Sequence, residues 1–162
     1  MWGVCQGPGP DTGNPALWGG AGLNAQHGLY EVIDGFSQVR GFDTSTATFI
    51  RGNKGWVVID PLTTTETARA DFELVTEHLG TPPVAAVIYT HSHVDHFVGI
   101  LGMVEQARID PGEVPIVAPE GCLLEARGAN LLAGQAMGPR ALCPFGMTHP
   151  LNAHAHAHPG PA

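Results

Sequence analysis

The feature that most constrains the fold is an apolar run of strand length that leads directly into a loop of metal-binding side chains. The run covers residues 84–89, and the loop that follows, residues 91–96, reads His-Ser-His-Val-Asp-His. Neutral imidazole and carboxylate groups are the ligands that Zn²⁺ and related divalent metals prefer. Proteins of the α/β class usually keep such groups at the carboxyl end of a strand. The pattern therefore predicts an α/β domain whose functional site lies at residues 91–96, here named the metal loop.

The spacing within the metal loop predicts two neighbouring metal ions. His91 and His93 are two residues apart, so in an extended loop both side chains project to the same side and can hold one ion. Asp95 and His96 follow and suit a second ion, and two ions about 3.5–4 Å apart can clamp an attacking and a leaving oxygen. The alternatives are a polar loop with chance histidines or a structural metal site. A structural site is normally closed by cysteine, so we favour a catalytic centre.

Composition excludes several classes of partner. The net charge is −8, from 7 Lys+Arg against 15 Asp+Glu, so no basic patch is available for nucleic acid or an anionic membrane. No apolar run approaches the roughly 20 residues of a membrane span. The first residues are rich in glycine and proline and lack the basic and apolar regions of a secretory signal. These features leave the compartment unassigned.

The three cysteines do not indicate a disulfide framework. Cys5, Cys122 and Cys143 are odd in number and widely spaced, and no CxxC pair occurs. We therefore expect free thiols.

The chain divides into three segments by composition. Residues 1–22 read as a flexible Gly/Pro-rich lead, which we expect to form neither helix nor strand. Residues 23–146 form the predicted domain. Residues 147–162 are a low-complexity tail of histidine, alanine and proline. Its histidines could chelate metal as a tag does, but we interpret the tail as disordered.

The pattern of apolar residues predicts a sheet that is partly antiparallel and partly parallel, in a layered α/β domain. The strand at 56–59 is apolar on both faces, so we expect it to be central and covered by helices. Thr63 and Glu66 have capping-box spacing at a helix start. That helix carries a core stripe of Ala68, Phe72, Val75 and Leu79. Strands are predicted at 29–33, 36–40, 46–50, 56–59, 84–89 and 115–118 (the last one buried), and helices at 63–79, 97–105 and 120–133.

These residues resemble the metallo-β-lactamase superfamily, whose signature is H-x-H-x-D-H after a strand. Within it the chain is similar to the alkylsulfatases, which hydrolyse alkyl sulfate surfactants such as dodecyl sulfate. Residues 55–63 and 130–137 carry this closer likeness, which runs from about Leu23 to about Gly146. It also includes residues 28–32, 38–43, 48–50 and 86–93. The resemblance implies a partial αββα sandwich, the N-terminal half of the superfamily's α/β fold.

The resemblance also implies roles for single residues. His91 and His93 match ligands of a first zinc ion, and Asp95 and His96 match ligands of a second. Asp95 is also the candidate catalytic residue. Asp60 matches an acidic residue that supports the metal loop from behind the ligands. The implied reaction is zinc-dependent hydrolysis of an alkyl sulfate ester by a metal-bound water. No substrate-binding residue is assigned.

Two departures from the family pattern affect these expectations. Val98 stands where the family usually has the first glycine of a pair, and would be strained if its φ were positive. The family's further ligands, two carboxylates and a histidine, and its sulfate-binding and dimerisation segments lie downstream and have no match here. Each zinc would then keep two protein ligands instead of three. We therefore expect partial zinc occupancy and weak or no activity of this chain alone.

Other readings remain open. The chain could be another hydrolase of the superfamily, of thioesterase or lactamase type, or a non-catalytic truncated product. A family-like homodimer would need the missing downstream domain. Half of a layered sheet would also expose strand edges and helix faces, so we expect poor solubility or self-association.

Overall fold

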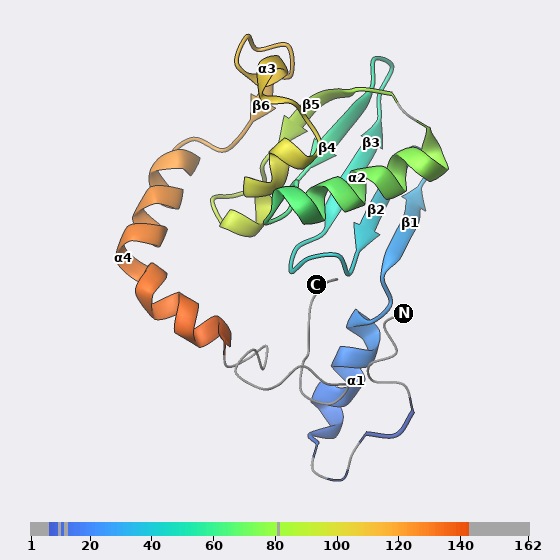
Figure 1. Ribbon diagram of the computed structural model, residues 1–162, viewed down its shortest axis with the longest axis vertical. Helices are drawn as coiled ribbons and strands as arrows, with labels where there is room; N and C mark the ends of the chain where they lie inside the picture. Colours follow the sequence, from blue (N-terminus) through green and yellow to red (C-terminus); the bar gives the residue numbers. More distant parts are fainter. Residues whose placement is uncertain (1–6, 10, 12, 81, 143–162) are drawn as a thin grey trace.

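The computed structural model describes residues 7–9, 11, 13–80 and 82–142 (Figure 1). Within them, six strands form one sheet whose spatial order follows the order of the chain. The strands are β1 (Gly28–Ile33), β2 (Phe36–Arg40), β3 (Ala47–Arg51), β4 (Trp56–Ile59), β5 (Val84–Ile88) and β6 (Ile116–Val117). The helices are α1 (Pro15–Asn24), α2 (Thr65–Leu79), α3 (Gln106–Ile109) and α4 (Cys122–Leu142), with 3₁₀ turns η1 (Val94–His96) and η2 (Val98–Gly102).

The sheet changes direction at β4. Strands β1 to β4 pair antiparallel with their neighbours, whereas β4, β5 and β6 pair in parallel. Helix α2 makes the crossover between β4 and β5 that parallel neighbours need. The mixed sheet and the predicted order of its strands are confirmed.

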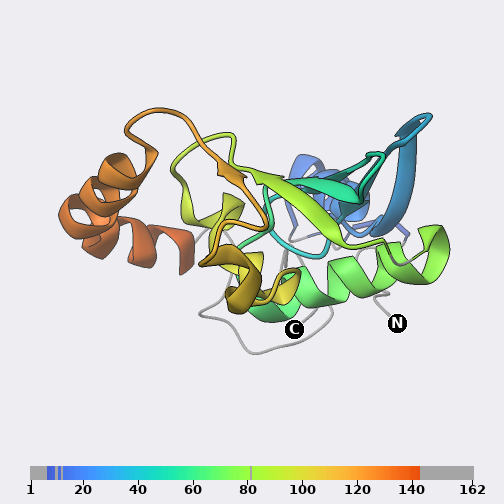
Figure 2. The same cartoon turned by 90° about the horizontal axis from the view of Figure 1, so that it is seen from above.

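One face of the sheet carries the core. Helix α2 lies across that face with η2 beside it, as the two views show (Figures 1 and 2). Along β4, Trp56 and Val58 point into this layer and are buried, whereas Val57 and Ile59 on the other face are only half-buried. Phe49 of β3 stacks on Phe72 of α2, with ring centroids 6.3 Å apart. The prediction that β4 is interior is confirmed, but only one of its faces is covered. One sheet under one helical layer is the predicted half of an αββα sandwich.

The start of α2 differs from the prediction. The helix is capped by Thr64, whose hydroxyl accepts a hydrogen bond from the Thr67 amide at 3.2 Å. The hydroxyl of Thr63 donates instead to Asp43 at 2.8 Å, so the predicted Thr63–Glu66 capping box is wrong. The apolar stripe of α2 does face the core: Ala68 and Val75 are buried, and Phe72 and Leu79 pack against them.

The lead contains a helix that the sequence analysis did not expect. The side chain of Asn14 accepts hydrogen bonds from the amides of Ala16 and Leu17, and Pro15 occupies the first turn. Asparagine before proline is a favoured helix start, and here it outweighs three interior glycines. The expectation of neither helix nor strand over residues 1–22 is therefore wrong for residues 15–22. Where the lead, the domain and the tail divide remains a prediction, and residues 147–162 lie outside the described residues.

The elements after the metal loop differ in length and burial from the predictions. Residues 98–102 form a 3₁₀ turn instead of an α-helix. β6 has two residues, of which Val117 is 55% exposed, so the predicted buried strand at 115–118 is wrong. Val98 is not among the described residues with positive φ, so the strain considered above does not arise.

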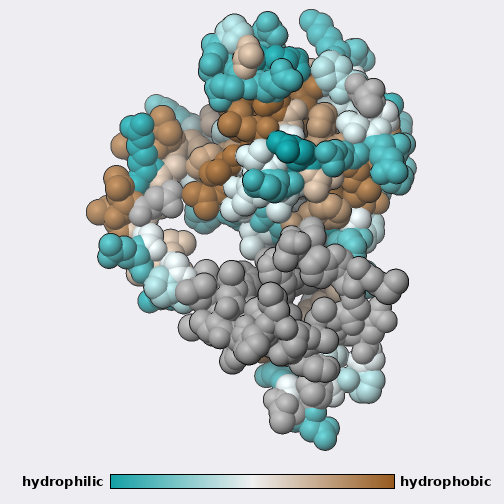
Figure 3. Space-filling view, viewed as in Figure 1, coloured by the Kyte–Doolittle hydropathy of each residue, from teal (hydrophilic) through white to brown (hydrophobic). Residues whose placement is uncertain are grey.

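Helix α4 projects from the β6 edge, away from the sheet (Figures 1 and 2). It is longer than predicted, and it exposes Leu123, Leu124, Leu131, Leu132 and Met137. Figure 3 shows hydrophobic surface over this helix. The expected exposure of an apolar helix face is confirmed. Among the described residues, no helix combines the length and the apolarity that crossing a membrane requires.

Candidate metal centre

The metal loop leaves the carboxyl end of β5, beside the point where β4 ends at Asp60. The two strands are parallel neighbours, and the Asp60 amide still donates to the Ile88 carbonyl at 3.0 Å. Asp60 and the metal loop therefore meet at one edge of the sheet, the place where α/β proteins build their sites.

The backbone turns sharply at Asp60. Asp60 and Leu62 have φ of 56° and 61°, in the left-handed region that non-glycine residues rarely occupy. The Leu62 amide donates to the Asp60 carbonyl at 2.9 Å and closes the turn. Strained backbone of this kind persists where the surrounding structure holds it, and it concentrates at functional sites.

The Asp60 carboxylate braces the loop at two points. It accepts a hydrogen bond from the Thr90 amide at 2.8 Å and another from the Thr90 hydroxyl at 2.6 Å. One of its oxygens lies 2.9 Å from Nδ1 of His96. The two atoms are close enough for an ion pair, but their geometry does not make a hydrogen bond. His96 Nδ1 is therefore buried without a hydrogen-bond partner among the described residues.

The same network determines which nitrogen of His91 can bind a metal. Thr90 has one hydroxyl proton, which it donates to Asp60, so its oxygen must accept from Nδ1 of His91, 2.9 Å away. His91 therefore carries its proton on Nδ1 and presents the lone pair of Nε2. His96 is arranged alike: Nδ1 faces Asp60, and Nε2 lies 3.3 Å from the Asp95 carboxylate. Metal-binding histidines are usually oriented in this way, by a partner on the other ring nitrogen.

The structure gathers all of the predicted site residues. The ring centroid of His91 lies 4.6 Å from that of His93 and 4.0 Å from that of His96. The two predicted ligand pairs are therefore adjacent. Among the described residues, however, no three histidine, cysteine or acidic side chains converge as a metal site requires. The donor types fit zinc, and the described residues offer them in pairs.

Two residues that contact this region were not found from the sequence. Asp43, in the β2–β3 loop (residues 41–46), accepts hydrogen bonds from the amide and hydroxyl of Thr63 at 3.0 and 2.8 Å. Burial acts to raise the pKa of Asp43, but these bonds and others from Thr67 and Thr44 outweigh it and lower the pKa. The hydroxyl of Ser45, in the same loop, donates to the main-chain carbonyl of Asp95. No local pattern marks either residue, because the partners lie 20 and 50 residues away.

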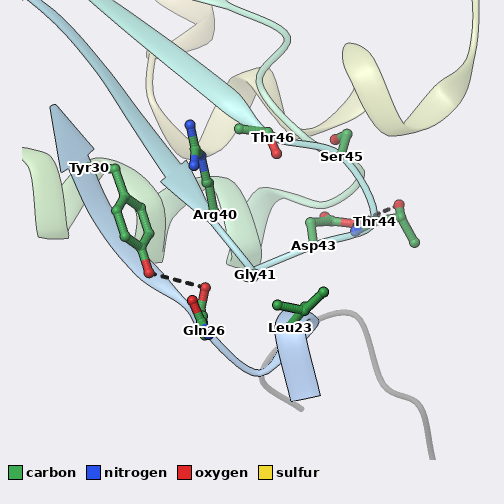
Figure 4. A pocket seen from close by; sticks show the side chains of 9 residues that line it. All are labelled: Leu23, Gln26, Tyr30, Arg40, Gly41, Asp43, Thr44, Ser45 and Thr46. Atoms are coloured by element: carbon green, nitrogen blue, oxygen red, sulfur yellow. Dashed lines mark hydrogen bonds between the residues drawn. The ribbon is translucent and has the colours of Figure 1, made fainter. Parts of the chain in front are cut away.

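A cavity of about 320 Å³ is lined by the β2–β3 loop together with residues of β1 and β2 (Figure 4). Its cation, Arg40, lies over the Tyr30 ring at 5.1 Å and donates two hydrogen bonds to Gln38, so its charge is engaged within the sheet. The cavity is lined by Leu23, Gln26, Tyr30, Arg40, Gly41, Asp43, Thr44, Ser45 and Thr46.

Known proteins resemble both the sequence and the fold. Residues 40–159 match the family described as the metallo-beta-lactamase superfamily. An alkyl/aryl-sulfatase of Saccharomyces cerevisiae is 47% identical over 137 residues, which are 85% of this chain and 21% of the yeast protein. A linear primary-alkylsulfatase of Pseudomonas sp. is 46% identical over 144 residues, 89% of this chain and 21% of that protein. The chain thus spans about a fifth of the length of these curated relatives.

A solved structure agrees. The stereoselective inverting sec-alkylsulfatase from Pseudomonas sp. superposes with a TM-score of 0.83 at 43% identity, over 91% of this chain and 23% of that one. The predicted resemblance in sequence and in fold is confirmed.

Proposed function

The chain belongs to the metallo-beta-lactamase superfamily, and from this premise we propose that it carries part of the metal centre of a zinc-dependent hydrolase of alkyl sulfate esters. The similarity to proteins named alkylsulfatases supports the substrate class. The main support for metal binding is the orientation of the imidazole rings of His91 and His96. Thr90 contacts Nδ1 of His91 and Asp60 lies 2.9 Å from Nδ1 of His96, so Nε2 of each ring is the nitrogen turned away from these supports, and Nε2 of His96 lies beside the Asp95 carboxylate.

Each residue has a distinct role in this proposal. His91 and His93 would hold one zinc ion, and Asp95 and His96 a second. Asp95 is the proposed catalytic residue, because its carboxylate would touch the second ion. Asp60 would orient the ring of His96, because its carboxylate lies 2.9 Å from Nδ1. When bound, zinc would supply Lewis-acid chemistry and an activated water for attack on the sulfate ester.

The number of ligands sets the expected strength of binding. A catalytic zinc site normally has three protein ligands, whereas each proposed ion would have two among the described residues. We therefore propose weak, partial zinc occupancy and slow turnover for this 162-residue chain by itself.

The test measures zinc content and hydrolysis together. The purified chain with excess zinc should release sulfate slowly from dodecyl sulfate, and a chelator or His91→Ala should abolish this release. The matched control is His78→Ala on α2, remote in sequence from the loop, which should leave the release unchanged. A thioester and a β-lactam are assayed in parallel. Faster cleavage of either, or release of sulfate that survives His91→Ala, would contradict the proposal. Two tightly held zinc ions with rapid turnover would contradict its weak-binding part.

A further inference from the structure

The β2–β3 loop is tied to the segment that joins β4 to α2. The Asp43 carboxylate accepts from the Thr63 amide at 3.0 Å, the Thr63 hydroxyl at 2.8 Å and the Thr67 hydroxyl at 2.8 Å. Within its own loop it also accepts from the Thr44 amide at 2.7 Å. Helix α2 already has Thr64 as its cap, so these bonds are not required to start the helix. Their effect is to hold residues 41–46 against Thr63 and Thr67.

The same loop is tied to the metal loop. Ser45 is 9% exposed, and its hydroxyl donates to the main-chain carbonyl of Asp95. Asp95 lies inside η1, whose backbone is otherwise closed by the His96 amide donating to the His93 carbonyl at 3.1 Å. Ser45 therefore fixes the backbone of a proposed ligand from a loop 50 residues away in sequence.

The residues just after the metal loop are bonded to the segment around Thr63, to which Asp43 is also bonded. The Gly99 amide donates to the Leu62 carbonyl at 3.0 Å, and Leu62 precedes Thr63. Asp43 therefore lies between two hydrogen-bonded contacts. In its own loop, Ser45 bonds to Asp95. On the other side, Asp43 bonds to Thr63, whose neighbour Leu62 bonds to Gly99.

We propose that Asp43 and Ser45 are positioning residues of the metal centre: Ser45 sets the place of Asp95, and Asp43 holds both supports of the segment from Asp95 to Gly99. This inference rests on the proposed function, because it assumes that Asp95 is a metal ligand. The alternative is that Asp43 only stabilises the start of α2. In that case its loss would lower the stability of the chain without a selective effect on either ion.

Three variants separate these roles. Ser45→Ala removes the hydroxyl that donates to the Asp95 carbonyl. Asp43→Asn removes the charge that gathers the threonine donors. Thr46→Ala is the matched control, because it removes a hydroxyl from the same loop that makes no hydrogen bond to the described part of the chain. Each variant is titrated with zinc while the backbone amide signals of His91, His93, Asp95 and His96 are followed by NMR.

Loss of a residue that orients a ligand typically costs 10–100-fold in metal affinity. For Ser45→Ala we expect the titration midpoint at Asp95 and His96 to rise about ten-fold, with little change at His91 and His93. Asp43→Asn should raise the same midpoint at least as much, and Thr46→Ala should match the wild type. Midpoints that stay unchanged in Ser45→Ala, or that rise equally at all four residues, would overturn the inference.

A metal-free measurement keeps the inference separate from the proposed function. Amide hydrogen exchange is measured at His96 and Gly99 without zinc. Ser45→Ala should speed exchange at His96 and leave Gly99 unchanged, whereas Asp43→Asn should speed both. If the wild-type amide signals do not change on addition of zinc, the proposed function fails. The exchange rates without zinc still show whether Ser45 and Asp43 hold the backbone at His96 and Gly99. Exchange in both variants equal to that of Thr46→Ala would overturn it.

Discussion

At the scale of single residues, three buried or half-buried carboxylates have contrasting environments. Asp60 and Asp43 are surrounded by hydrogen-bond donors. Asp71, on the core side of α2, is fully buried, and neither of its oxygens has a partner among the described residues. Burial, and secondarily the negative charge of Asp43, raise the pKa of Asp71 to about 8. Asp71 is therefore protonated in the folded chain at neutral pH.

This predicts a stability that falls as the pH rises. The folded state holds a proton that the unfolded chain, with an aspartate pKa of 3.8, releases. The contribution of Asp71 is therefore intact below about pH 4 and is lost progressively up to about pH 8. Asp71→Asn keeps the shape and removes the charge. It should be more stable than the wild type by on the order of 4 kcal/mol at pH 7, with little difference at pH 4.

Urea denaturation at several pH values measures this difference. The control is Asp34→Asn in the exposed β1–β2 turn, for which we expect no such pH-dependent gain. The difference in unfolding free energy between Asp71→Asn and the wild type should therefore change with pH. If it stays constant from pH 4 to pH 8, Asp71 is not buried as an uncharged group.

The proposed metal ligands and their support Asp60 could be named from the sequence and stay a prediction, whereas Asp43 and Ser45 could not be found there. His91, His93, Asp95 and His96 lie within six residues of one another, so their chemistry appears in a single short pattern. Ser45 acts on Asp95 from a distant loop, and nothing near it in sequence indicates this. Asp71 lies three residues after Ala68 and so on the apolar stripe, but a charged residue at such a position is normally expected to reach solvent.

At the scale of elements, the fit of η2 against the start of α2 positions the end of the metal loop. A Cβ atom at Gly99 would lie 2.2 Å from the Pro61 carbonyl oxygen and 2.6 Å from that of Thr64. One at Gly102 would lie 2.3 Å from the Thr65 carbonyl oxygen. Since these contacts are with backbone, they cannot be relieved by rotating a side chain. The close approach requires glycine at both positions.

Gly99→Ala should therefore separate η2 from α2. We expect a loss of about 1–3 kcal/mol in the free energy of unfolding, typical of an overpacked core, and weaker zinc binding. The control is Gly128→Ala in α4, where a Cβ meets nothing within 4 Å. That change should be neutral or stabilising by up to about 1 kcal/mol. Equal stability of the two variants would refute the close packing described here.

The strands were easier to predict than the ends of the helices. β2, β3 and β4 were located to within about one residue. β2 alternates because burial of one face imposes a period of two, and β4 is a short continuous apolar run. The cap of α2 was misplaced because Thr63 and Thr64 are both plausible caps locally. Only the distant Asp43, which takes the hydroxyl of Thr63, decides between them.

At the scale of the whole molecule, the described residues form one sheet with one covered face and an apolar helix that stands apart. Leu131 and Leu132 of α4 are 82% and 90% exposed. Contiguous exposed apolar surface of this kind promotes association. The mixed topology was predictable from the order of elements, whereas the length and projection of α4 were not, because no periodic apolar stripe fixes what that helix packs against.

The chain should therefore self-associate as its concentration rises. In sedimentation velocity, the mean mass should increase over a concentration range of about ten-fold, and Leu131→Gln with Leu132→Gln should suppress the increase. Leu17→Gln, which removes an exposed leucine of α1, is the control and should have little effect. A wild-type chain that remains a single monomeric species throughout would contradict this prediction.

The central claim is that His91, His93 and His96 bind zinc, with His91 and His96 binding through Nε2 because Thr90 and Asp60 lie at their Nδ1 atoms. Side-chain ¹⁵N NMR of the histidines during a zinc titration tests it most directly. We predict that the Nε2 signals of His91 and His96 and a ring-nitrogen signal of His93 shift, that Nδ1 of His91 and His96 stays protonated, and that His27 and His78 do not respond. Zinc-dependent shifts confined to the histidines of residues 149–158, with the metal loop unchanged, would contradict the claim.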